Sequence, residues 1–338
     1  MRRVIISALA LALLPAAAFA QEPPVQQPPT QPPAQTAPAA PAQPAAPAAA
    51  QQAGEMSRFL PGFTVSKVKT SGTTIHVVKG GQGPPLLLLH GAPQSHITWR
   101  LVAPELAKRY TVVVPDLRGY GDSGKMPDTP DHAGYSKRAM ALDHVEVMKH
   151  FGFDRFPVVG QDRGGRVAHR MALDHADKVT KIAVLDIVPT YYLYTHVTKE
   201  FIQAYFHWFN YIRPAPAPEN ELKAAADRRP APANPVQAEY QRTSGTLENI
   251  HAMCEDYRAA ASIDLKHDEA DLSRKIACPL LTLWGARGSM GRLYDVLAVW
   301  REKAVNVSGK GLPGGHNLQE EEPVWNEVLT ELTAFLKA

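Results

Sequence analysis

The chain has 338 residues, with 36 basic side chains against 33 acidic ones and only two cysteines. A charge balance this close to neutral gives no electrostatic reason to expect nucleic acid or an anionic membrane surface as a partner. Two cysteines are too few for a disulfide scaffold. Cys254 and Cys278 are expected to be buried free thiols, and a single bridge between them is the alternative.

The first 54 residues are expected to lie outside the folded domain. Residues 1–20 combine two early arginines with an apolar run and a small-x-small cleavage site, which predicts a secretory signal. The run is too short to span a membrane, and an uncleaved anchor is the alternative. Residues 21–54 consist mostly of Pro, Ala and Gln and predict a disordered linker. We therefore expect an exported protein, periplasmic or secreted, without stable membrane association after signal cleavage.

From residue 55 onward, apolar runs alternate with helical patterns. Residues 63–68 and 74–78 alternate in polarity and predict an antiparallel pair. Mostly apolar runs predict strands that are buried on both faces, at 86–89, 111–114, 156–159, 182–185 and 279–284. The last strand is expected at 305–307. Apolar spacing predicts helices at 98–108, 137–151, 163–175 and 321–336. This alternation predicts an α/β fold built on a mainly parallel, doubly wound sheet.

The alternation of strands and helices fails between residues 190 and 274. This segment is rich in aromatic residues, His, Pro and Ala. It predicts a helical lid inserted over the carboxyl ends of the strands, where open α/β sheets bind ligands. The domain at 55–338 is then expected to consist of a core, 55–189 and 275–338, and a lid at about 190–274.

The most informative stretch lies at residues 158–166, where a buried strand is expected to turn sharply into a helix. The glycines around Asp162 give it the layout of a nucleophile elbow, in which serine is the usual central residue. A serine that displaced a halide would form an ether, which water does not readily cleave. A carboxylate forms an ester, which water can open at the carbonyl. Asp162 therefore indicates two-step displacement at carbon, and an inactive elbow or a helix-capping aspartate is the alternative.

His316 and Asp186 are the candidate partners of Asp162. His316 follows two glycines in a loop before the closing helix, and it would activate the water that opens the ester. Asp186 ends the strand after the elbow and would orient the imidazole, a structural carboxylate being the alternative. The other possible position for the acid, the loop 285–290, contains none. The order nucleophile, acid, histidine is that of enzymes with this elbow.

A group of motifs gives the chain a resemblance to a known family. The motifs lie at residues 90–94, 116–121, 162–166, 169–175, 183–191, 207–208, 214–220 and 254–259. On these residues the sequence resembles the α/β-hydrolase fold over 55–338, and within it the fluoroacetate (haloacetate) dehalogenases, with epoxide hydrolases as nearest neighbours. The resemblance implies a hydrolase acting on carbon–halide bonds of a small-molecule substrate, with no metal and no organic cofactor. A homodimer is left open, as is the preferred halogen.

Arginines beside the nucleophile suit a substrate that carries a carboxylate. Arg163 and Arg166 are three positions apart on a predicted helix, so their guanidinium groups can converge on one anion near Asp162. The resemblance assigns both to the substrate carboxylate. The alternative is that they are ordinary surface arginines on a helix with partners elsewhere. In this fold the backbone N–H groups of Arg163 and Ala92 would bind the oxyanion that forms when water attacks the ester.

The resemblance also implies a halide pocket in the lid. His207, Trp208 and Tyr257 match the residues of the family that hold the leaving halide, and all three carry N–H or O–H donors. The alternative is that the lid aromatics simply pack against one another.

Several positions depart from the family pattern. Gln161 stands where the family has His, Ala92 replaces an aromatic residue, and Leu193 replaces a tyrosine of the lid entrance. The lid between residues 220 and 251 is also shorter. These changes predict a more open pocket that admits larger haloacids.

Three other functions compete with dehalogenation. An epoxide hydrolase uses the same Asp and His, and Tyr257 with Tyr205 could protonate the opening oxygen, although Arg163 argues against it. An ester or lactone hydrolase would normally use serine. A non-catalytic exported binding protein could keep the fold without turnover.

Overall fold

The computed structural model describes residues 57–337. The signal expected at 1–20 lies outside these residues, and so does the linker expected at 21–54. Within 57–337, none of the helices combines the length and the hydrophobicity that a membrane crossing would require.

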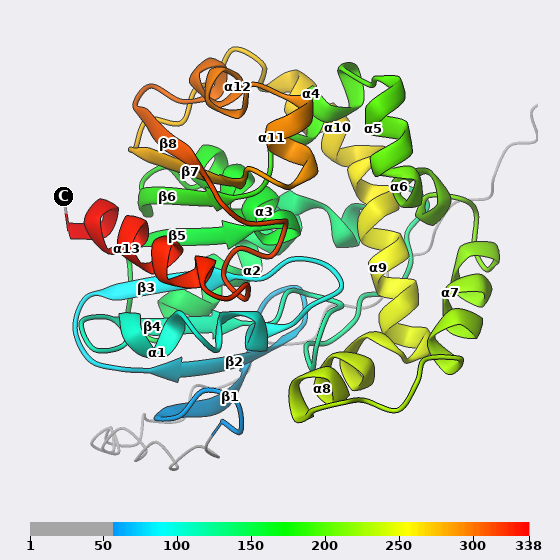
Figure 1. Cartoon of the computed structure of the whole chain (residues 1–338), viewed down its shortest axis with the longest axis horizontal. Coiled ribbons are helices and arrows are strands. Elements are labelled where there is room, and N and C mark those ends of the chain that lie inside the picture. Colours follow the sequence, from blue (N-terminus) through cyan, green and yellow to red (C-terminus); the bar gives the residue numbers. More distant parts are fainter. Residues whose placement is uncertain (1–56, 338) are drawn as a thin grey trace, which may run out of the picture. The chain divides into compact units, whose positions relative to one another are not determined.

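The described residues contain one sheet of eight strands (Figure 1). Its spatial order is β1-β2-β4-β3-β5-β6-β7-β8. β2 pairs antiparallel with β1 and β4, and the other neighbouring strands pair in parallel. The strands are β1 (Phe63–Lys69), β2 (Thr74–Gly80), β3 (Pro85–Leu89), β4 (Thr111–Pro115), β5 (Phe156–Gln161), β6 (Val179–Leu185), β7 (Leu280–Gly285) and β8 (Val307–Leu312). The predicted α/β class with a mainly parallel sheet is confirmed.

Helices cover both faces of this sheet and form the lid. They are η1 (His96–Trp99), α1 (Ala103–Leu106), η2 (Ala133–Tyr135), α2 (Lys137–His150), α3 (Asp162–Asp174), α4 (Thr190–Thr195), α5 (Lys199–Ala204), α6 (Phe206–Tyr211), α7 (Ala217–Asp227), α8 (Pro235–Ser244), α9 (Leu247–Ala260), α10 (Ile263–Ala270), α11 (Ser289–Leu293), α12 (Val296–Lys303) and α13 (Val324–Lys337). Figure 1 shows α5 to α10 gathered beyond one end of the strands. The segment predicted as a lid is thus helical from α4 to α10.

The apolar run of β3 explains why a strand without alternation belongs at the centre. Leu87 and Leu89 lie in a core cluster that also contains Met140 of α2 and Val167 of α3. Leu86 and Leu88 point to the other face, where they share a core cluster with Val328 and Leu332 of α13. All four leucines are fully buried. Successive strand residues face opposite sides, so both faces of β3 need apolar side chains.

Two local predictions are wrong, each for an identifiable reason. The continuous helix expected at 98–108 is divided into η1 and α1, because Pro104 lacks the N–H that an uninterrupted helix needs there. The last strand begins at Val307 instead of residue 305 and continues to Leu312. Gly309 has no side chain, so it interrupts the pattern from which a strand is predicted. The strand needs glycine there, because a Cβ would lie 2.0 Å from the carbonyl oxygen of Thr282 in β7.

Both cysteines are free thiols. Cys254 is buried as expected, whereas Cys278 is only half-buried. The alternative of a single disulfide bridge is therefore not realised in this structure.

Candidate active site

Asp162 sits at the sharp turn between β5 and α3. Its backbone is left-handed, with φ of 44°, a conformation that is uncommon for residues other than glycine, although aspartate adopts it more readily than most. The turn needs glycine on both sides. A Cβ at Gly160 would lie 2.4 Å from the carbonyl oxygen of Gly164, and a Cβ at Gly164 would lie 2.5 Å from that of His90. The glycines seen in the sequence therefore allow the close backbone packing that holds Asp162 at the end of the sheet.

The structure brings Asp186 and His316 together beside Asp162. His316 Nδ1 lies 2.6 Å from Asp186 Oδ2, and Asp186 Oδ1 accepts a hydrogen bond of 2.9 Å from the backbone N–H of Gly285. Burial by itself lowers the pKa of His316, but the hydrogen bond to Asp186 and the negative charge of Asp162 raise it above its ordinary value. The Asp186 contact fixes the ring so that Nε2 is left for other partners.

Asp162 is surrounded by groups that favour its ionised form. Burial alone raises the pKa of this carboxyl, but the charges of His316, Arg166 and Arg163 together lower it below its ordinary value. The backbone N–H of Ala92 adds to this effect by donating to Asp162 Oδ2 at 3.1 Å. One carboxylate oxygen, Oδ2, is thus held by a backbone donor, and the other, Oδ1, has no hydrogen-bond partner among residues 57–337.

The two predicted backbone donors lie on different segments. Ala92 follows β3, and Arg163 is in the first turn of α3, where backbone N–H groups have no acceptor within the helix. The contact from Ala92 to Asp162 places one of them at hydrogen-bond distance from the carboxylate. This arrangement suits an oxyanion that forms on Asp162 Oδ2.

Arg163 is not a surface arginine. Its side chain is completely buried, and its Nε and Nη2 each donate at 2.8 Å to the carboxylate of Asp256 on α9. Nη2 also donates to the backbone carbonyl of Asp256. The guanidinium lies 4.2 Å from the ring centroid of Tyr257. Its third nitrogen, Nη1, is buried and has no hydrogen-bond partner among the described residues.

Arg166 is buried beside it and is held in a similar way. Its Nη1 donates to the carbonyl oxygen of Val188 at 3.0 Å and to Thr190 Oγ1 at 3.2 Å. Its guanidinium lies 4.9 Å from the ring centroid of Trp208. The Nε of Arg166 is buried and lacks a partner within residues 57–337. The arginines are therefore not at the surface, but both have partners elsewhere, as the alternative predicted. Each still has a buried nitrogen without a hydrogen-bond partner among the described residues.

The residues predicted to hold a halide come together from α6 and α9. The rings of Trp208 and Tyr257 are 5.6 Å apart in an edge-to-face arrangement, and the rings of His207 and Tyr257 are 6.2 Å apart. Burial and the charge of Asp162 raise the pKa of Tyr257 far above its ordinary value, so its hydroxyl remains a donor. Burial lowers the pKa of His207, which favours the neutral ring.

The lid aromatics also pack as the alternative predicts. Phe201 stacks on Tyr205 at 5.1 Å and meets Phe209 edge-on at 6.2 Å, and both Tyr205 and Phe201 contact Trp208. Packing and donation do not exclude each other, because ring faces form the cluster while the polar edges of Trp208 and Tyr257 stay available.

Two further residues belong to the site but carried no predicted role. Asp256 was visible only as a neighbour of Tyr257 in a lid motif, and the structure makes it the anchor of Arg163. Gln161 was noted only as a departure from the family. Its Nε2 lies 3.3 Å from His316 Nε2 and 3.3 Å from the His316 carbonyl oxygen. A polar residue directly before the nucleophile was the available signal for Gln161.

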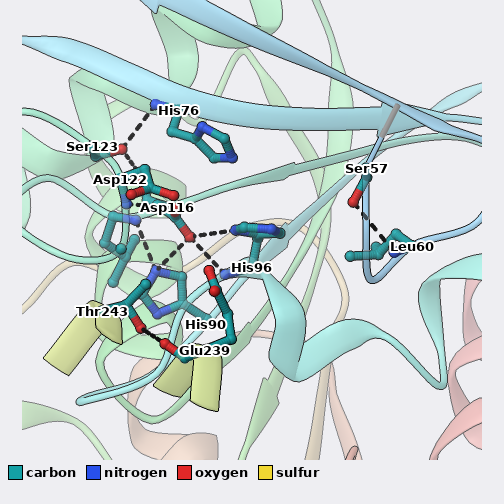
Figure 2. A network of polar contacts seen from close by, with 12 residues as sticks. Ser57, Leu60, His76, His90, His96, Asp116, Asp122, Ser123, Glu239 and Thr243 are labelled. Carbon is teal, nitrogen blue, oxygen red and sulfur yellow. Dashed lines mark hydrogen bonds and ion pairs between the residues drawn. The ribbon is translucent and has the colours of Figure 1, made fainter. Parts of the chain in front are cut away.

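A buried network around Asp116 fixes the loop that carries Ala92 (Figure 2). Asp116 Oδ1 accepts from the backbone N–H of His96 at 2.6 Å and contacts His96 Nδ1 at 2.9 Å. His90 Nε2 accepts from the backbone N–H of Leu117 at 2.9 Å. The loop after β4 therefore holds both sides of the Ala92 loop.

The same network contains a possible set of metal ligands. His76, His96 and Asp116 lie close enough together to bind an ion. Both oxygens of Asp116, however, already accept hydrogen bonds, from His96 and from the backbone N–H of Asp122. The two oxygens of Asp116 therefore already have hydrogen-bond partners within the network drawn in Figure 2.

An elbow, a histidine bonded to an acid after the next strand, and a helical lid define a hydrolase of the α/β type. The family model described as alpha/beta hydrolase fold matches residues 84–323, and the chain belongs to this family.

Within this family, the chain is similar to several individual proteins. The chain is 44% identical over 275 residues to a fluoroacetate dehalogenase of Burkholderia sp, covering 78% of this chain and 90% of the relative. It is 33% identical over 279 residues to a soluble epoxide hydrolase of Corynebacterium sp. (strain C12), covering 75% and 91%. A crystal structure of a Salmonella enterica protein provisionally called an acyltransferase aligns with a TM-score of 0.80 and 48% identity, covering 83% and 97%. The resemblance inferred from the motifs is thus confirmed.

Proposed function

We propose that the protein is a hydrolytic dehalogenase of short 2-halo carboxylic acids. The observation that carries this proposal is the pair of buried, unused donors beside the nucleophile: Arg163 Nη1 and Arg166 Nε have no partner in the described part of the chain. A buried donor without an acceptor costs free energy, so a substrate that supplies one is favoured. Two guanidinium groups suit a carboxylate, which would place C2 of the acid near Asp162.

In the first step, Asp162 Oδ1 attacks C2 and the halide leaves with the electron pair of the carbon–halogen bond. The product of this step is an ester between Asp162 and the substrate. His207, Trp208 and Tyr257 are the candidate donors to the departing halide. The lowered pKa of Asp162 supports its role as an ionised nucleophile at neutral pH.

In the second step, His316 Nε2 takes a proton from water, and the water oxygen attacks the ester carbonyl carbon of Asp162. The negative charge that forms on Oδ2 is stabilised by the backbone N–H groups of Ala92 and Arg163. The bond between the carbonyl carbon and the substrate oxygen then breaks, and that oxygen takes the proton from His316. A 2-hydroxy acid is released, and the Asp162 carboxyl group, which now carries the water oxygen and its remaining proton, loses that proton to solvent and becomes a carboxylate again. Asp186 stabilises the protonated imidazole in between.

The fluoroacetate dehalogenase among the relatives supports this substrate class. The soluble epoxide hydrolase among them keeps a second candidate function in view. The specific observation in its favour is that burial raises the pKa of both Tyr257 and Tyr205, so both hydroxyls could protonate an epoxide oxygen. The buried cation of Arg163 next to Asp162 favours the haloacid instead, because a neutral epoxide would leave its free donor unpaired.

The test offers fluoroacetate, chloroacetate, 2-chloropropionate and styrene oxide to the purified protein and follows halide and diol. Halide release is expected, and diol without halide would reject the dehalogenase. Asp162→Asn should lower halide release by on the order of 10⁴-fold or more. Asp177→Asn is the matched control, because Asp177 is a surface residue after α3 and should leave turnover unchanged. A protein that binds these acids without releasing halide would instead be a binding protein on this fold.

A further inference from the structure

A cavity of about 390 Å³ opens beside the proposed nucleophile. Ala92, His207 and Tyr257 line it. Ala92 is the residue whose backbone N–H contacts Asp162, so the cavity borders the point where C2 of a substrate would react. Ala92 also has only a methyl group, which leaves this side of the reaction centre open.

The volume is much larger than a haloacetate requires. Cavities of about 300 to 1,000 Å³ commonly hold drug-sized ligands, whereas haloacetate has only two carbon atoms. Leu222 of α7 and Ile250 and Met253 of α9 give the cavity an apolar wall. An apolar arm on C2 of the acid would be covered by these side chains.

The cavity also contains one cation without an acidic partner. Arg229, in the loop after α7, lines it together with Ser244 at the end of α8. Arg229 Nη1 donates to Ser244 Oγ at 3.0 Å, and no carboxylate among residues 57–337 lies within ion-pair distance of this guanidinium. Three other arginines of the lid are paired: Arg213 with Glu221, Arg242 with Asp122 and Glu239, and Arg258 with Glu219 and Glu255. Arg228, the neighbour of Arg229, also has no ion pair among residues 57–337, but Arg228 does not line the cavity.

Arg229 lies at the outer side of the cavity. Its side chain is exposed, and it lines a neighbouring surface cavity as well. The cavity therefore leads from the reaction centre, past an apolar wall, to a cation at the solvent. Arg163 and Arg166 do not line it, so a carboxylate bound to them leaves the cavity free for a second group.

We infer that the preferred substrates are 2-halo acids whose C2 carries an apolar arm ending in a second carboxylate, which pairs with Arg229. This inference rests on the proposed dehalogenase function and names its substrate class. The first carboxylate binds Arg163 and Arg166, the methylene groups contact Leu222, Ile250 and Met253, and the distal carboxylate reaches Arg229. The chemistry at C2 is unchanged, so the product is a 2-hydroxy dicarboxylic acid and halide.

The experiment compares 2-bromoacetate, 2-bromohexanoate and the diacids 2-bromobutanedioate, 2-bromohexanedioate and 2-bromooctanedioate, with bromide release as the readout. We expect kcat/KM for the best diacid to exceed that for bromoacetate by roughly tenfold, because its methylene groups are buried against the apolar side chains of the cavity. We expect the diacid to exceed the monoacid of equal length by about three- to fivefold, the range of a solvent-accessible ion pair.

Variants of Arg229 identify the cation. Arg229→Ala should reduce the ratio of diacid to monoacid of equal length to about one, and Arg229→Lys should retain most of it, because the charge remains. Arg228→Ala is the matched control, since Arg228 is an adjacent exposed arginine that does not line the cavity. It should leave the ratio unchanged.

The results distinguish failure of the diacid substrate class from failure of the dehalogenase function. Bromide from bromoacetate with no gain from any longer acid would overturn the substrate class and keep the dehalogenase. A monoacid that equals its diacid, or a ratio that survives Arg229→Ala, would also overturn it. Absence of bromide from every acid would reject the proposed function together with this inference.

Discussion

Asp256 offers the sharpest test of how the lid organises the site. Its carboxylate is fully buried and contacts Arg163, Lys137 and the Tyr120 hydroxyl, the last at 2.6 Å. Asp256→Asn keeps the shape of the side chain but removes its charge. Lys137 retains Asp264, whose Oδ2 lies 3.4 Å from its Nζ. Arg163 has no other acidic partner among residues 57–337, so a buried cation is left uncompensated.

The expected cost follows from that unpaired cation. Removing one member of a buried ion pair lowers the free energy of unfolding by about 3 to 5 kcal/mol. For a domain of this size, the midpoint of thermal unfolding should fall by on the order of 10 °C. The guanidinium group of Arg163 also loses the carboxylate that orients it, so KM for a haloacid should rise more than kcat falls.

Thermal unfolding followed by circular dichroism gives the first quantity, and halide release gives the second. Glu221→Gln is the matched control, because it breaks an exposed pair with Arg213 and should leave the midpoint unchanged. A midpoint for Asp256→Asn equal to that of the unmodified protein would refute the claim that Arg163 depends on this carboxylate.

Three other predictions concern the turn at Asp162 and the histidine beside it, His316. The pKa of His316, followed by NMR, should lie above 6.5 and fall in Asp162→Asn, since the Asp162 charge helps to raise it; an unchanged pKa would contradict their contact. Gln161→Met should slow ester hydrolysis roughly three- to tenfold without slowing the first release of halide, and equal slowing of both would reject its action on His316. Gly164→Ala should destabilise by about 1 to 3 kcal/mol in denaturant unfolding, because its Cβ meets the His90 backbone. Gly134→Ala, with its nearest atom at 3.4 Å, should not.

The sequence predicted the parts of the fold that depend on local pattern. β3 was visible as a solid apolar run because both of its faces are covered, and α2 and α3 were visible from helical spacing. The elbow was visible because its glycines and Asp162 are adjacent in the chain. The two wrong predictions had local causes too: Pro104 interrupts a helical pattern, and Gly309 leaves one position of a strand without a side chain.

The sequence by itself determined the order Asp162, Asp186, His316 and the chemistry that an aspartate at an elbow favours. Only the tertiary structure decided which residues support that chemistry. Asp256 meets Arg163 across 93 positions, and Gln161 meets His316 across 155. The direction of Arg229 toward the cavity likewise depends on how the lid helices pack. A local pattern records which face of an element is buried, whereas contacts across such separations depend on the packing of whole elements, and no short stretch of sequence encodes that.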